Sequence, residues 1–152
     1  MNQIEFIGDQ LQRAYAGEAW HGPSLQELLA GVTAEQALAR PIAGAHSIWE
    51  LTMHIGLWTS AARRRLAGDP AQLTPQEDWP LIDGGSPSAW RQTLDALEQE
   101  HNQLQAAVCS LAESSLENQA PGKNHSFEFM LHGVIQHNLY HAGQIALLKK
   151  AL

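Results

Sequence analysis

The sequence is poor in features that define several classes of protein. Its 152 residues include one cysteine, Cys109, which excludes an intramolecular disulfide and any zinc site with several cysteine ligands. Lysine and arginine number 9 against 16 aspartate and glutamate residues, so the formal net charge is −7. Nucleic acids and anionic membranes are bound by clustered cationic side chains, and this acidic balance argues against both partners. The basic run Arg63-Arg64-Arg65 lies at an expected helix end, where cations compensate the helix dipole.

Long apolar runs are also missing. No stretch approaches the roughly 20 apolar residues of a transmembrane helix. The first residues lack the basic and apolar parts of a signal peptide, so we expect none. We therefore expect a cytoplasmic protein. A chain of 152 residues is long enough to bury one core, which predicts a single domain over residues 1–152.

The apolar residues recur at helical spacing, and period-two alternation is nearly absent. Glycine and proline separate the periodic segments. This pattern predicts four long helices, and their ranges are roughly Asn2 to Ala16, Ser47 to Leu66, Ser86 to Leu111, and Ser126 nearly to the end. Shorter helices are expected from Leu25 to Leu29 and over 33–39, the first opened by a capping box at Ser24.

The segment 70–87 is rich in proline and glycine and is too long for a simple helix connection. It is better explained as a crossover that spans the length of a bundle. The predicted fold is all-α, a four-helix bundle with a long crossover between the second and third long helices.

Eight histidines stand out in so acidic a chain. His137 and His141 are four residues apart on the apolar stripe of the last helix, so both imidazoles can reach one ion. His54 lies at the edge of the stripe of its own helix and faces a neighbouring helix. These three residues would offer three neutral nitrogen ligands and leave a coordination position for water or substrate, as catalytic zinc sites do. For His54 alone, a packed and hydrogen-bonded core histidine is an equal alternative.

The other histidines have simpler explanations. His101 lies on the apolar stripe of the third long helix, and we predict a hydrogen bond across the bundle instead of metal binding. The remaining four are assigned to caps, loops or the surface, and they are His21, His46, His125 and His132.

Two polar residues are candidates to orient the metal ligands. Glu50 lies one turn before His54, and Gln144 lies three residues after His141. Ligating histidines usually donate their second ring N–H to such a group. Both have alternatives, because Glu50 is also the acid of the Ser47 capping box and Gln144 can bond across the bundle.

Two segments resemble the DinB-like (DinB/YfiT) superfamily of metal-binding four-helix bundles. Residues 46–58, HSIWELTMHIGLW, are similar to the second-helix signature with its first ligand, and residues 136–145, QHNLYHAGQI, to the fourth-helix signature with the other two. Weaker similarity covers residues 20–25, 29–37 and 40–41. The resemblance implies a divalent metal ion, typically zinc or nickel, on His54, His137 and His141. It also implies the long crossover and a homodimer.

The function implied by the resemblance is less uniform. Characterised members look like S-transferases or isomerases that use low-molecular-weight thiols, and some are metal-dependent hydrolases. We predict a metal-dependent thiol S-transferase acting on a small-molecule substrate, with Cys109 as a packed thiol and not the nucleophile. The alternatives are a metal-dependent hydrolase, a non-catalytic metal-stabilised bundle, and a bundle whose histidines are ordinary polar core residues. Imidazole ligands suit several metals, so the sequence does not choose the ion.

Overall fold

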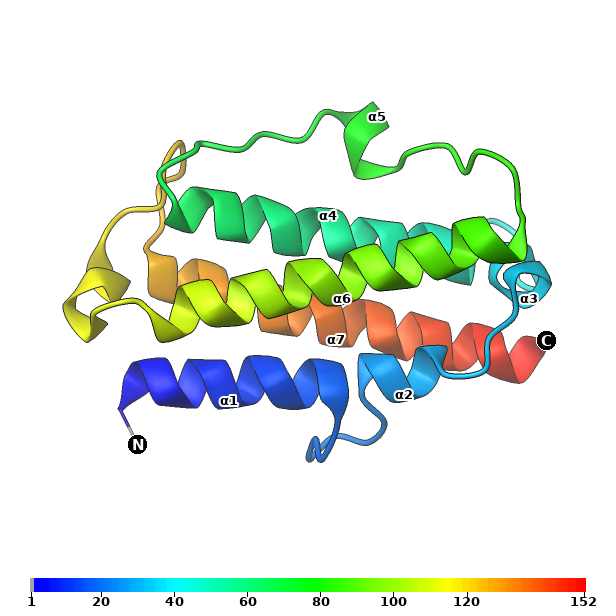
Figure 1. Cartoon of the computed structure of the whole chain (residues 1–152), viewed down its shortest axis with the longest axis horizontal. Coiled ribbons are helices and arrows are strands. Elements are labelled where there is room, and N and C mark those ends of the chain that lie inside the picture. Colours follow the sequence, from blue (N-terminus) through cyan, green and yellow to red (C-terminus); the bar gives the residue numbers. More distant parts are fainter. Residues whose placement is uncertain (1) are drawn as a thin grey trace.

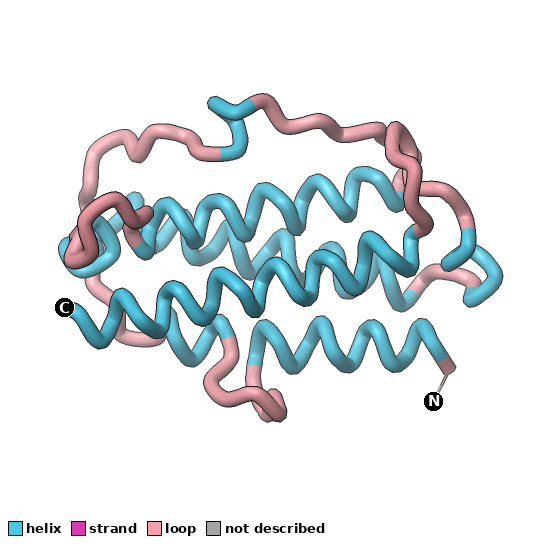
Figure 2. Tube along the Cα trace, turned by 180° about the vertical axis from the view of Figure 1, so that it is seen from behind, coloured by secondary structure: helices cyan, strands magenta, loops and turns pink. Residues whose placement is uncertain are grey.

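The computed structural model describes residues 2–152, and within that range every regular element is a helix (Figure 2). Four long helices, α1 (Gln3–Ala16), α4 (Ile48–Leu66), α6 (Pro87–Cys109) and α7 (Phe127–Ala151), form the bundle in Figure 1. α4 packs against α6 and α7, and α1 packs against the same two helices. The prediction of an all-α helical bundle is therefore confirmed. Within the same range, none of the helices combines the length and the apolar character that crossing a membrane requires.

Short helices occupy the connections. They are α2 (Leu25–Leu29), α3 (Ala34–Leu38), α5 (Pro75–Asp78) and the 3-10 helix η1 (Glu113–Glu117). α2 and α3 lie where the sequence predicts them, whereas α5 and η1 were not expected. α6 also ends at Cys109, two residues before the expected Leu111. Leu111 still packs against the core through a tight turn, in which its N–H bonds the Val108 carbonyl, so the apolar spacing continues beyond the helix.

Cys109 is exposed, so the prediction of a packed thiol is wrong. The preceding residue, Val108, is fully buried and takes the core-facing position in the last turn of α6. Successive helical residues point about 100° apart, which turns the cysteine away from the core.

Reciprocal capping boxes fix where several helices begin. The Ser47 hydroxyl accepts a hydrogen bond from the Glu50 N–H, and a Glu50 carboxylate oxygen accepts one from the Ser47 N–H at 2.7 Å. The same exchange opens α2 at Ser24 and α3 at Thr33. Each box satisfies two backbone donors that a helix start would otherwise leave unpaired. The start of α4 at Ile48 sets the register that places His54 on the face toward α7.

The connection between α4 and α6, residues 67–86, is named the strap here. In Figure 1 both helices run in the same direction, and the strap returns beside α4 with α5 in its middle. The buried Arg65 side chain fixes its first part, because Nη2 donates to the Ala71 carbonyl at 2.7 Å. The Arg65 guanidinium also lies 5.6 Å from the Trp58 ring centroid, a cation–π contact. The strap is therefore held against α4 by specific polar contacts.

The apolar core is divided into two clusters along the bundle. Trp49 and Trp90 dominate one cluster, and Ile7, Leu104 and Leu131 belong to the other. Both buried indoles have hydrogen-bond partners, since Trp49 Nε1 donates to Thr93 Oγ1 and Trp90 Nε1 donates to the Val32 carbonyl. α7 contributes side chains to both clusters, as expected for a helix that contacts both α1 and α4.

His101 forms the predicted hydrogen bond across the bundle. Its Nε2 lies 3.1 Å from Gln12 Oε1 on α1, and its ring stacks on Tyr15 with centroids 4.0 Å apart. The side chain is 2% exposed, and its Nδ1 has no hydrogen-bond partner among the described residues. Burial lowers the pKa of His101 to about 4, so the folded protein holds this ring neutral.

His101 is expected to make the fold sensitive to acid. The unfolded chain, with a histidine pKa near 6.5, takes up a proton that the folded state refuses. The stability contribution is thus complete above pH 6.5 and is lost as the pH falls toward 4. A His101→Gln variant keeps an amide beside Gln12 but does not titrate. Between pH 6.5 and 4.5 its free energy of unfolding should fall by about 2 kcal/mol less than that of the parent.

Urea denaturation in the presence of chelator measures this difference. His21→Gln is the matched control, because His21 is exposed in a loop. Equal pH slopes for the His101→Gln variant and the parent would contradict the assignment.

Candidate metal centre

The structure brings His54 of α4 together with His137 and His141 of α7. His137 Nε2 lies 3.0 Å from His54 Nε2 and 3.1 Å from His141 Nε2. Two imidazole nitrogens bound to one tetrahedral zinc at about 2.05 Å would be about 3.3 Å apart, close to these spacings. His54 and His141 are buried, and His137 is half-buried. The three side chains can therefore hold one metal ion.

The outer nitrogens of two rings face acceptors, which fixes where their protons lie. His54 Nδ1 is 2.9 Å from Asp78 Oδ1 and 3.1 Å from the Asp78 carbonyl oxygen. His141 Nδ1 is 2.5 Å from Gln144 Oε1. In their neutral forms both rings therefore carry the proton on Nδ1, and both Nε2 lone pairs point toward His137. His137 Nε2 carries either a proton, which it can donate to only one of them, or a lone pair that faces both, so at least one of the two contacts at about 3 Å has no hydrogen bond. A cation between the rings would bind the lone pairs that are left without a donor.

The electrostatics of the cluster also favour neutral imidazoles. Burial, together with the neighbouring His141 and His54, lowers the pKa of His137 to about 4. Burial also lowers the pKa of His141, while the hydrogen bond to Gln144 acts in the opposite direction. Neutral rings present the lone pairs that a metal ion requires, so protons compete little with metal binding near pH 7.

Comparison with known families agrees with this geometry. The family model of the DinB superfamily matches residues 19–145, which include all three clustered histidines. The chain belongs to the DinB superfamily. The comparisons with curated proteins and with solved structures gave no match.

In this DinB bundle, Asp78 is the residue that holds His54 in position. It is the last residue of α5 in the strap, and its Oδ1 also accepts a hydrogen bond from Trp58 Nε1 at 2.7 Å. Glu50, the candidate from the sequence, is placed elsewhere. Its carboxylate caps Ser47 and forms an ion pair with Arg40 at 2.5 Å, which agrees with the alternative assignment as a capping acid. Gln144, the second candidate, does contact its histidine.

Trp79 covers one side of the histidine cluster. Its ring stacks on His54 with centroids 3.9 Å apart and on His46 with centroids 3.6 Å apart. From the sequence, His46 was assigned to a cap, a loop or the surface, and its stack on Trp79 was not predicted. Sequence reasoning missed both Asp78 and Trp79, although the Thr74 capping box, with Pro75 after it, is a readable signal for α5. The box indicates a helix but does not say which side chain of α4 it would meet.

An Asp78→Ala variant should bind zinc about tenfold more weakly than the parent, because His54 loses the carboxylate that orients it. The Asp78 carbonyl remains as an acceptor, which keeps the loss near the lower end of the usual range. Competition with a chromophoric chelator measures the affinity.

Two controls accompany the Asp78→Ala variant. Glu77→Ala removes the neighbouring carboxylate, which contacts Thr74 and not the cluster, and Glu50→Gln tests the residue suggested by spacing. Both should leave zinc affinity within about twofold. If Glu50→Gln lost as much zinc affinity as Asp78→Ala, the assignment of Asp78 as the residue that orients His54 would be contradicted.

Proposed function

We propose that this DinB protein binds one divalent metal ion, zinc or nickel, through His54, His137 and His141 and transfers a low-molecular-weight thiol to a small electrophile. The observation that supports the proposal is the convergence of the three Nε2 atoms on one another. Three protein ligands leave a coordination position free, as in catalytic zinc sites, whereas structural sites use four. The family's metal binding supports the same conclusion.

A bound divalent ion would supply the acidity, because it lowers the pKa of a thiol or of water. The residues of the chain do the rest. Asp78 and Gln144 hold the Nδ1 protons of His54 and His141, so that both Nε2 atoms keep their lone pairs for the ion. Trp79 covers His54 and limits the approach of water from that side.

Solvent and substrate would approach along α7. His137 is half-buried, and Tyr140, whose ring edge contacts His141 at a centroid distance of 5.1 Å, is 67% exposed. In the transfer, the thiol sulfur forms a bond to the electrophilic carbon, and the leaving group departs with its electron pair. The thiol proton passes to solvent. This balance requires no cysteine from the protein.

Metal content is the first test of the proposal. Protein purified without a histidine tag and then incubated with zinc or nickel should hold about one ion per chain, and His54→Ala should hold much less. His21→Gln is the control, since this exposed histidine lies outside the cluster. A metal content well below one ion per chain that does not rise on incubation with zinc or nickel would overturn the metal site.

Turnover is the second test. Metal-loaded protein should accelerate the reaction of a small thiol with 1-chloro-2,4-dinitrobenzene, and His54→Ala should lose about a hundredfold or more of that rate. Cysteine, glutathione and other small thiols form the panel. Ester hydrolysis without thiol transfer would favour a metal-dependent hydrolase. A change in melting temperature without any turnover would favour a non-catalytic, metal-stabilised bundle, and either result would overturn thiol transfer.

A further inference from the structure

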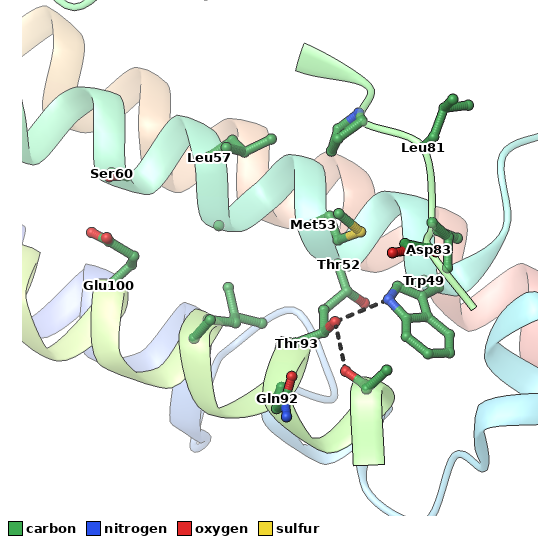
Figure 3. A pocket seen from close by; sticks show the side chains of 16 residues that line it. Trp49, Thr52, Met53, Leu57, Ser60, Leu81, Asp83, Gln92, Thr93 and Glu100 are labelled. Carbon is green, nitrogen blue, oxygen red and sulfur yellow. Dashed lines mark hydrogen bonds between the residues drawn. The ribbon is translucent and has the colours of Figure 1, made fainter. Parts of the chain in front are cut away.

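A second site lies on the other side of α4. Here α4, α6 and the strap enclose a cleft of about 510 Å³, within the size range of small-molecule sites (Figure 3). Residues of α4 from Trp49 to Ser60 and residues of α6 from Ala89 to Glu100 form its walls, and residues 80–83 of the strap border it. None of the three clustered histidines lines this cleft. It is therefore separate from the metal centre.

The polar groups of Trp49, Thr52 and Thr93 in the cleft are already paired within the protein. Trp49 Nε1 donates to Thr93 Oγ1, and Thr93 Oγ1 donates to the Ala89 carbonyl (Figure 3). Thr52 Oγ1 donates to the carbonyl of Ile48 within α4. With these groups satisfied, the cleft offers a ligand mainly apolar side chains such as Met53, together with the exposed amide of Gln92. An apolar body would gain from burial there, by about 25 cal/mol for each Å² removed from water.

Small residues on the facing helices create the open space. Gly56 of α4 and Ala96 of α6 both line the cleft. A Cβ added to Gly56 would meet Leu97 Cδ1 at 3.8 Å, which is ordinary contact, so packing does not require glycine there. Leu81, on the strap beside the cleft, is 95% exposed. An exposed leucine next to an unfilled apolar space is a typical feature of a binding site.

The charges around the cleft select the ligand. Among the side chains that line it in the described structure, the charged ones are Asp83 and Glu100, which lie at opposite ends in Figure 3. Arg63 neutralises Glu100 through contacts at 2.9 and 3.3 Å. Asp83 is exposed. The cleft thus combines an apolar interior with one uncompensated carboxylate.

We propose that this cleft binds an apolar small molecule that carries an amine. The apolar body lies against Met53, Leu57 and Leu97, and the ammonium group lies toward Asp83. Anions are disfavoured because no cationic side chain is free to meet them among the lining residues. This proposal does not depend on the thiol-transfer function, since none of its residues belongs to the histidine cluster.

Three naphthalene compounds of the same body and different charge test the proposal. Isothermal titration calorimetry with the full chain should show that 1-naphthylmethylamine binds about three- to fivefold more tightly than 1-naphthylmethanol and about tenfold more tightly than 1-naphthylacetate. Asp83→Asn should bring the amine to the affinity of the alcohol. Asp95→Asn, an exposed acid of α6 outside the cleft, should leave the ranking unchanged.

Two matched variants assign the binding to the cleft, because an amine can also ligate a metal ion. Ala96→Phe fills the cleft and should weaken amine binding about tenfold or more, whereas Ala106→Phe places the same side chain on an exposed site of α6 outside it. Thermal melts followed by circular dichroism confirm that both variants fold. The proposal would be overturned if none of the three compounds bound, if 1-naphthylacetate bound as tightly as the amine, or if the amine and the alcohol had equal affinity. Equal effects of Ala96→Phe and Ala106→Phe on amine binding would also overturn it.

Discussion

One residue of the strap, Asp78, contacts two side chains of α4, and much of the arrangement around α4 depends on it. Trp58 Nε1 donates to Asp78 Oδ1 at 2.7 Å, and His54 Nδ1 is 3.1 Å from the Asp78 carbonyl oxygen and 2.9 Å from Oδ1. These contacts bring the middle of the strap onto α4. Trp79 then follows Asp78 into its stack on His54, and Pro80 to Asp83 reach the cleft toward α6. A single aspartate therefore connects the position of an irregular segment to the orientation of a histidine of the candidate metal centre.

The helices were largely predictable because their signals are local. The capping box at Ser47 and the apolar spacing of α4 fixed the face that carries His54, and the four-residue spacing of His137 and His141 placed them on one face of α7. The cluster of these three residues follows once α4 packs against α7. Family membership supports the bundle, while the single domain, the homodimer and the identity of the metal stay predictions.

The contacts of the strap were not predictable for a physical reason. Asp78 lies 24 residues after His54, and the path between them passes through irregular backbone that no periodic pattern describes. Glu50 seemed the better partner because helical spacing is readable from sequence, yet its carboxylate was already committed to the cap and to Arg40. Cys109 shows a related limit of sequence reasoning, because it directly follows the buried Val108 on α6 and yet its own side chain is exposed.

The distance along the chain between the clustered histidines has a further consequence for the bundle as a whole. His54 and His137 are 83 residues apart in sequence and 3.0 Å apart in space. An ion shared by them would close that loop as a cross-link does, and by the loop-closure relation used for disulfides this would be worth about 4–5 kcal/mol. A chain with one cysteine cannot form such a bridge within itself from sulfur. A cross-link made of imidazole and metal opens with acid or a chelator and does not respond to reductants, so the cohesion of α4 with α7 would follow the supply of metal and not the redox state of the surroundings.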